Sequence, residues 1–438
     1  MNKETVKILL AEQRALIAGT TLIPRPFEPE PSLNYAFTGL RRAGKTYTMY
    51  QHAQKLVREG LPADAVCAVN FEDERWGNLT AGDLDVIKQC QEELCAARPV
   101  FFFDEIQNVS GWEKFARRLA DQKFRVFITG SNARMLSGEI SSTLGGRYMV
   151  REVWPFTFSE FLATGGIDVS GANALSKNAR EIETRFDTYF RFGGLPEVAG
   201  VAGKREWLSN LYQKLYFGDL LARHQIRNDF ALRVLMRKVA ENIGSPCSFN
   251  RLAHAVSSAG KRVGTDTVID YLGYAKEAWL LFDIENIEAK FCERESIKKY
   301  YFADNGLLNL FLTDPVAALL ENSVAIRLKQ TRGGDVFFYR NGVETDFYLP
   351  AEQTAIQVCV SLDAPESRAR EIRSLRKLAK RFPLKKMDIV TLGGEEVIAA
   401  GTAAIEDAED RADCGIGDGT GGEIRVIPAW KWLLENPA

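Results

Sequence analysis

The fold of this 438-residue chain is decided by one glycine-rich stretch and the residue after it: Gly39-Leu40-Arg41-Arg42-Ala43-Gly44-Lys45-Thr46-Tyr47. The stretch follows the short apolar run at residues 34–38 and precedes a helical pattern that extends to about residue 59. Two glycines allow backbone N–H groups to curl around phosphate oxygens, and the start of a helix favours an anion. Lys45 would contact the terminal phosphates and the Thr46 hydroxyl would contact Mg²⁺. The stretch therefore predicts a loop that binds ATP and Mg²⁺.

The apolar run Val100–Phe103 is followed directly by two acidic residues, Asp104 and Glu105. In a phosphate-binding fold, Asp104 would complete the Mg²⁺ shell that Thr46 begins, from the carboxyl end of a neighbouring strand. Glu105 would orient and polarise the attacking water. The alternative is a buried strand that ends in exposed acids. The phosphate loop upstream favours the catalytic assignment.

A third strand is predicted at residues 125–129 and is followed by Gly130, Ser131 and Asn132. A polar residue at this tip can reach the γ-phosphate or the water, so Asn132 or Ser131 is the candidate sensor. A simple turn is the alternative, because Gly, Ser and Asn favour turns. A catalytic Glu105 and a sensor on adjacent strands predict that the sensor strand lies between the loop strand and the Asp104 strand.

Arg147 ends the segment Leu144-Gly145-Gly146-Arg147. It could act as an arginine finger on the nucleotide of a neighbouring copy, which requires a homo-oligomer. The alternative is a structural arginine in a surface ion pair.

The first part of the chain alternates between predicted strands and helical patterns. The strands are at residues 34–38, 66–71, 100–104 and 125–129, and the helical patterns include 84–97 and 112–120. This alternation predicts an α/β fold with a parallel sheet covered by helices on both faces. Three helical patterns near residues 231–277 and a following strand indicate a winged-helix segment. A further α/β pattern begins near residue 306.

The chain resembles a large prokaryotic family of AAA-type P-loop ATPases with a fused C-terminal domain of unassigned function. The motifs that carry the resemblance are Arg41–Thr46, Asn70–Glu74, Phe103–Gln107, Ile128–Ser131, Trp154–Phe161, Phe192–Glu197, Asp219–Leu221, Lys299–Gly306 and Leu320–Asn322. The resemblance implies an ATPase domain of the AAA/ASCE type over residues 1–162, a helical lid over 163–228, a winged-helix-like segment over 229–305 and a restriction-endonuclease-like domain over 306–438. It also implies that Gly194 and Pro196 form a turn that touches the nucleotide base, although a plain helix-breaking turn explains them equally well.

An endonuclease-like site needs acids that bind Mg²⁺ and a lysine that helps to activate water. Glu321 and Asp346 match the first two acidic positions of that layout. Gln357 stands where the third acid belongs, and Cys359 stands where the lysine belongs. We therefore expect this domain not to cut nucleic acid. The arginine- and lysine-rich helix predicted at residues 367–382 is either a nucleic-acid contact or a solvated face.

The formal net charge is -2, so no overall basic field attracts nucleic acid, and any such surface must be local. Seven cysteines at irregular spacing, without a Cys-x-x-Cys pair, fit a reducing compartment, and the sequence indicates no apolar signal core or membrane-spanning run. A cytoplasmic location follows as the expectation. Residues 401–422 are rich in Gly, Ala and Asp and predict a mobile loop.

The leading interpretation is a Mg²⁺-dependent ATPase that couples the nucleotide state to domain movement, with DNA or a protein as the candidate partner. One alternative is a nucleotide-gated binding switch with little turnover. Another is a nuclease of a defence or mobile-element system, against which Gln357 and Cys359 argue.

Overall fold

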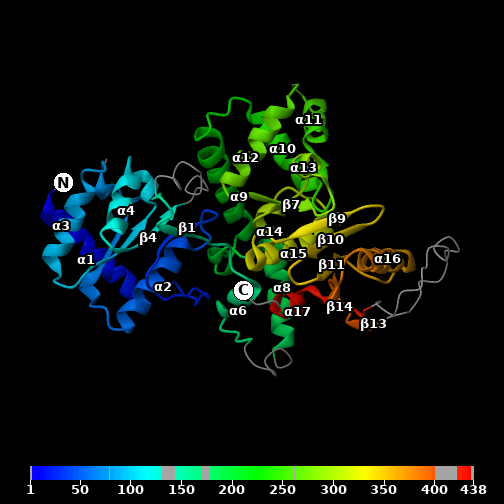
Figure 1. The fold of residues 1–438 in the computed structure, drawn as a ribbon, viewed down its shortest axis with the longest axis horizontal. Helices are drawn as coiled ribbons and strands as arrows, with labels where there is room; N and C mark the ends of the chain where they lie inside the picture. Colours follow the sequence, from blue (N-terminus) through cyan, green and yellow to red (C-terminus); the bar gives the residue numbers. More distant parts are fainter. Residues whose placement is uncertain are drawn as a thin grey trace. The chain divides into compact units, whose positions relative to one another are not determined.

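The computed structural model describes residues 2–77, 79–130, 144–169, 178–260, 262–399 and 422–435 (Figure 1). The chain forms two compact units. Unit 1 comprises residues 1–156, 195–197 and 276–279, and unit 2 comprises residues 157–194, 198–275 and 280–438. The sensor candidates Ser131 and Asn132, and all of the predicted mobile loop except Gly422, lie outside the described residues. The division into four parts at residues 162, 228 and 305 stays a prediction.

Unit 1 contains a five-stranded sheet whose neighbouring strands are all parallel. Its strands, in spatial order, are β2 (Val66–Asn70), β3 (Val100–Asp104), β4 (Arg125–Gly130), β1 (Asn34–Thr38) and β5 (Tyr148–Glu152). The strand β4 lies between β1 and β3, which confirms the predicted place of the sensor strand. The edge strand β5 was not predicted, because its apolar run of Tyr148, Met149 and Val150 is short; in the structure only Tyr148 of its five residues is buried.

Both faces of this sheet are buried, as a parallel sheet requires. Four helices accompany it: α1 (Lys3–Gly19), α2 (Lys45–Arg58), α3 (Leu84–Leu94) and α4 (Trp112–Asp121). Phe101 and Phe103 belong to a core cluster that includes residues of α1, α3 and α4. The intervening Phe102 instead stacks on Phe127 of β4, at a ring distance of 5.1 Å. This period of two explains why the run of phenylalanines forms a strand with two apolar faces.

Unit 2 contains a mixed sheet of nine strands. In spatial order they are β13 (Glu396–Ile398), β14 (Ile424–Pro428), β12 (Lys386–Thr391), β11 (Thr354–Val358), β10 (Glu344–Leu349), β9 (Phe337–Arg340), β7 (Leu281–Asn286), β8 (Ile297–Phe302) and β6 (Cys247–Ser248). Parallel pairing of β7 with β9 continues the sheet across the predicted boundary at residue 305.

The described part of unit 2 also contains helices (Figure 1). They are α6 (Phe158–Ala163), α8 (Ala179–Phe192), α9 (Lys204–Lys214), a π-helix (Leu215–Ala222), α10 (Asp229–Glu241), α11 (Phe249–Ser258), α12 (Thr265–Glu277), α13 (Phe291–Ser296), α14 (Asn305–Leu308), α15 (Val316–Arg332), α16 (Pro365–Arg381) and α17 (Ala429–Glu435). Of these, α12 extends by two residues into unit 1. The helices α10, α11 and α12 match the three predicted between residues 231 and 277. The strands that follow them belong to the nine-stranded sheet, so the winged-helix assignment stays a prediction.

Candidate functional site

The glycine-rich loop joins the end of β1 to the start of α2. Gly39 has a φ of 147°, and a β-carbon there would lie 2.1 Å from the carbonyl oxygen of Val153. Gly44 has a φ of 99° and caps the N-terminus of α2, which begins at Lys45. Both positions therefore require glycine. The loop presents the start of a helix, where backbone N–H groups and the helix dipole favour an anion.

The Lys45 side chain is buried inside this loop and is 5% exposed. Its ammonium donates to the carbonyl oxygens of Gly39 and Leu40, each at 3.1 Å. The loop thus surrounds its own lysine, as expected for a cradle that contacts terminal phosphates.

Asp104 lies at the carboxyl end of β3 with hydroxyl groups on two sides. The Thr46 hydroxyl is 3.0 and 2.9 Å from the two Asp104 carboxylate oxygens, and the Thr129 hydroxyl donates to one of them at 2.5 Å. Burial raises the pKa of Asp104 to about 6, and the Glu105 charge adds to the rise, while hydrogen bonds from both threonines and the charge of Lys45 oppose it. Oxygen ligands of this kind are what Mg²⁺ prefers.

Glu105 occupies the left-handed region of the backbone, with a φ of 50° between β3 and the short helix that follows. Its N–H donates to the Thr129 hydroxyl at 2.9 Å, and its carboxylate accepts a short hydrogen bond from the Gln107 amide. A non-glycine residue with positive φ stores local strain, and such strain clusters at functional sites.

Thr129, the penultimate residue of β4, was missed by the sequence analysis. Its hydroxyl touches both acidic positions, whereas the sequence placed the sensor at Ser131 or Asn132, outside the described residues. Phe103 pairs with Ile128, so the next residues along these parallel strands, Asp104 and Thr129, lie side by side, and the sequence alone does not reveal this register.

The remaining loop residues have partners in unit 1. Arg42 pairs with Glu197 at 2.5 Å, and Arg41 lies 3.4 Å from Glu72. Pro196 lies beside the loop, since a β-carbon on Gly44 would be 3.7 Å from its ring. Tyr47 is 56% exposed on the first turn of α2. Gly194, the other residue of the predicted base-contacting turn, belongs to unit 2 and donates its N–H to Asp304 at 2.8 Å.

Arg147 forms an ion pair with Asp121 at 2.5 Å and also donates to the carbonyl oxygen of Gly145 at 3.2 Å. These contacts are those of the structural alternative that the sequence left open. A role for Arg147 on a neighbouring copy stays a hypothesis.

Two acids expected at the endonuclease-like site, Glu321 and Asp346, contact a lysine that was not predicted from the sequence. Lys299, on β8, is fully buried, and its ammonium lies 2.9 Å from Glu344, 3.2 Å from Asp346 and 3.4 Å from Glu321. Tyr301 donates its hydroxyl to Glu321 at 2.8 Å. Burial lowers the pKa of Lys299, but the three acids raise it by more, so the ammonium is held charged. These five residues form the Lys299 cluster.

Gln357 supports this cluster from β11. Its amide oxygen accepts from the Asp346 N–H at 2.6 Å, and its amide nitrogen donates to Glu371 of α16 at 2.6 Å. Asp346 also accepts from the Val358 N–H at 2.9 Å. The position expected to hold a third acid therefore holds a neutral residue whose hydrogen bonds are used inside the protein. Burial raises the pKa of Cys359, which keeps that thiol neutral.

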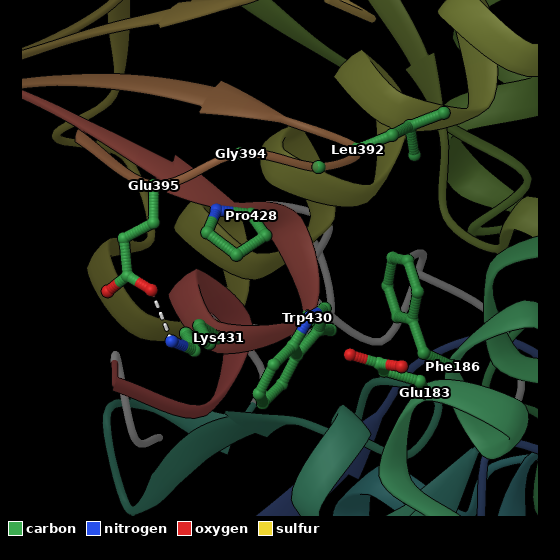
Figure 2. Close-up of a pocket in the computed structure, with 9 residues that line it drawn as sticks. Glu183, Phe186, Leu392, Gly394, Glu395, Pro428, Trp430 and Lys431 are labelled. Atoms are coloured by element: carbon green, nitrogen blue, oxygen red, sulfur yellow. Dashed lines mark hydrogen bonds and ion pairs between the residues drawn. The ribbon is translucent and has the colours of Figure 1, made fainter. Parts of the chain in front are cut away.

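A separate cavity of about 390 Å³ lies in unit 2 (Figure 2). Figure 2 shows the Glu183 carboxylate next to the rings of Phe186 and Trp430, and an ion pair between Glu395 and Lys431 at the other side. None of the site residues predicted from the sequence is among the residues that line this cavity.

Across the described ranges, no group of three or more His, Cys, Asp or Glu side chains is arranged to hold a metal ion by itself. In the same ranges, every helix is too short or too polar to cross a lipid bilayer.

Two family profiles match the chain. One is described as an AAA domain and matches residues 33–162, and the other is described as a domain of unknown function (DUF8612) and matches residues 183–315. With the strand order and the loop geometry, the first match defines an AAA-type P-loop ATPase domain.

Two relatives share most of the chain. The uncharacterized protein MJ1544 of Methanocaldococcus jannaschii is 30% identical over 409 residues, which cover 90% of this chain and 87% of the relative. An uncharacterized protein of Haemophilus influenzae is 27% identical over 342 residues, which cover 75% of this chain and 82% of that relative. The chain belongs to the same family as MJ1544.

Solved structures resemble the chain only distantly. The Walker-type ATPase PABY2304 of Pyrococcus abyssi gives a TM-score of 0.40 at 13% identity and covers 71% of this chain and 95% of its own. AMPPCP-bound DnaA from Aquifex aeolicus gives 0.25 at 15% identity and covers 63% and 86%. Both TM-scores lie below 0.5, so the fold assignment rests on the strand order and the AAA match.

Proposed function

We propose that this protein is a Mg²⁺-dependent ATPase that converts ATP and water to ADP and phosphate and uses the nucleotide state to move its other domains. The observation that carries the proposal is the convergence at the end of β3. There the Thr46 hydroxyl, from the helix that starts the phosphate loop, lies within 3.0 Å of Asp104. Thr129 joins the same carboxylate to the backbone of Glu105.

The residues present fit ATP and Mg²⁺. The Gly39–Gly44 loop and the N-terminus of α2 would hold the phosphates, and Lys45 would contact their terminal oxygens. Thr46 and Asp104 offer oxygen ligands to a cation. Because burial raises the pKa of Asp104 to about 6, a nearby cation would stabilise its charged form. When bound, Mg²⁺ would offset charge on the phosphates.

Glu105 is the proposed group that accepts a hydrogen bond from the attacking water and polarises it. Gln107 and Thr129 hold its carboxylate and its backbone, so that Glu105 is oriented before the nucleotide arrives. Thr129, or a residue in the Ser131–Asn132 segment, is the proposed sensor of the γ-phosphate.

Phosphate release from ATP tests this assignment. Lys45→Ala and Glu105→Gln should each lower the turnover by about a hundredfold or more, because each removes a group that acts on the developing charge or on the water. A matched control is Lys88→Ala on α3, which removes a lysine outside the site. Equal rates in wild type, Lys45→Ala and Glu105→Gln would remove the enzyme assignment.

A nucleotide-gated switch with slow turnover is the second candidate, with DNA or a partner protein as its target. The basic residues of α16 give little support to a DNA contact, because several are already paired: Arg368 with Glu396, Arg370 with Glu371 and Arg381 with Glu288. DNA affinity with and without ATP, at a fixed salt concentration, separates the candidates. A nucleotide-dependent affinity with negligible phosphate release would favour the switch.

For the C-terminal region we propose an endonuclease-like domain that does not cut nucleic acid. In support, Lys299 occupies the space among the acids and Gln357 provides no carboxylate. Plasmid DNA incubated with the protein and Mg²⁺ should stay intact. Cleavage that disappears in Asp346→Ala would instead support a nuclease of a defence or mobile-element system.

A further inference from the structure

Arg25 lies in the proline-rich stretch before β1 and reaches the phosphate loop. Its guanidinium donates to the carbonyl oxygen of Ala43 at 3.0 Å and to that of Trp154 at 2.8 Å. The same group lies over the Phe156 ring, 5.3 Å from its centre. Arg25 thus joins the loop to the segment that follows β5.

The position of Arg25 is itself fixed by the helix that begins with Lys45. Gln51, on α2, accepts a hydrogen bond from the Arg25 N–H at 2.9 Å and donates its amide to the Arg25 carbonyl at 2.8 Å. Both backbone groups of Arg25 are therefore held by one side chain. The loop, its helix and Arg25 form a closed set of contacts within unit 1.

The contact with Ala43 has a direct consequence for the loop. A trans peptide is planar, so the carbonyl of Ala43 and the N–H of Gly44 point in opposite directions. Holding this carbonyl toward Arg25 turns the Gly44 N–H to the other side of the loop backbone. A flip of this peptide would replace a phosphate donor by a carbonyl oxygen that repels phosphate.

We propose that Arg25 is a positioning residue of the ATP site, and that it sets the direction of the Gly44 N–H through the Ala43 carbonyl. The inference rests on the proposed function, because it presumes that the loop binds ATP. Arg25 acts through the loop backbone, and Gln51 acts through Arg25.

Isothermal titration with AMPPNP and Mg²⁺ tests the inference. Arg25→Ala should weaken binding about tenfold, since two charge-assisted hydrogen bonds are lost. Gln51→Leu should weaken binding in the same direction. The double variant should be no weaker than Arg25→Ala, because Gln51 acts only through Arg25. The matched control, Arg58→Ala at the exposed end of α2, should bind like wild type.

Steady-state turnover separates positioning from general damage. The KM for ATP of Arg25→Ala should rise about tenfold while kcat falls by less than twofold, because Asp104 and Glu105 keep their own contacts. Additive losses in the double variant, or an AMPPNP affinity within twofold of wild type in Arg25→Ala, would overturn the inference.

If the Arg25→Ala variant does not fold, Arg25→Lys tests the inference in its place. A lysine cannot bridge the Ala43 and Trp154 carbonyls as the planar guanidinium does. The affinity of Arg25→Lys should fall about threefold, and an unchanged value contradicts the inference. Failure of wild type itself to bind AMPPNP would refute the proposed function instead.

Discussion

Two regions of this molecule hold carboxylates away from bulk solvent, and the partners of these carboxylates differ. At the end of β3, Asp104 is held by the hydroxyls of Thr46 and Thr129, and its pKa is raised to about 6. In the Lys299 cluster, an ammonium lies within 3.4 Å of three acids. Under the proposed function, the first arrangement would gain stability when Mg²⁺ binds together with ATP. The second contains its own cation, and we expect its ion pairs to stabilise the sheet.

The largest effect is expected from removing the internal cation, the Lys299 ammonium. Lys299→Met should destabilise unit 2 by about 3–5 kcal/mol, because three partly buried carboxylates lose their shared, fully buried partner. Urea denaturation followed by circular dichroism measures the loss. The matched control is Lys380→Met on the exposed face of α16, which should change the stability by less than about 0.5 kcal/mol. A loss no larger than that of the control would mean that the Lys299 cluster contributes nothing to the sheet.

The second test removes the carboxylate of Asp104. The folded pKa of Asp104, about 6, lies above the ordinary value of 3.8, so the stability it contributes is present below pH 3.8 and is lost as the pH rises through 6. Asp104→Asn should therefore be more stable than wild type at pH 7.5, by about 3 kcal/mol from 1.36 kcal/mol per pKa unit. The gain should disappear near pH 4.

Thermal melting without nucleotide, at both pH values, measures the effect of Asp104→Asn. Asp64→Asn, at an exposed acid of the same unit, is the control and should not change the pH dependence. A variant less stable than wild type at pH 7.5 would show that Asp104 is already neutralised within the protein.

The smallest expected effect concerns His52, a buried titratable group that has neither the hydroxyl partners of Asp104 nor the ion pairs of Lys299. The rings of Phe27, Phe102 and Phe127 lie around His52, and both of its ring nitrogens are buried without a hydrogen-bond partner among the residues that the structure describes. Burial lowers the pKa of His52 to about 3. Its folded pKa is below the ordinary value of 6.5, so the unfolded state binds the proton first and stability is lost as the pH falls from 6.5 toward 3.

His52→Phe should remove this loss, which amounts to about 2 kcal/mol at pH 5. Urea denaturation of both proteins at pH 7.5 and pH 5 measures it, with His254→Phe at an exposed position as the control. An equal pH dependence in wild type and His52→Phe would place the titrating group elsewhere.

The sequence predicted most of unit 1 because its signals are local. Gly39, Gly44 and Lys45 are close in the chain, and the run Val100–Phe103 is apolar on both faces. The strand order followed from the chemistry of Glu105 and the expected sensor. By contrast, β5 has four exposed residues, and its apolar run of Tyr148, Met149 and Val150 is too short to distinguish an edge strand from a loop.

The Lys299 cluster could not be predicted, since its parts come from β8, α15 and β10. Spacing along the chain indicated where a lysine was missing, at Cys359, but not that another strand would supply one. Thr129 was missed for a different reason. A threonine at the end of a strand also has the β propensity of an ordinary strand residue, so its role appears only beside Asp104.

The complete burial of Lys299 makes it a reporter of motion. An amine-acylating reagent reaches only solvent-accessible, deprotonated lysines. Lys299 is inaccessible, and it is held charged while its ion pairs with Glu321, Glu344 and Asp346 persist. Its rate of chemical labelling, followed by mass spectrometry, would therefore measure how often the nine-stranded sheet opens. Exposed lysines such as Lys380 would supply the internal reference for reagent activity.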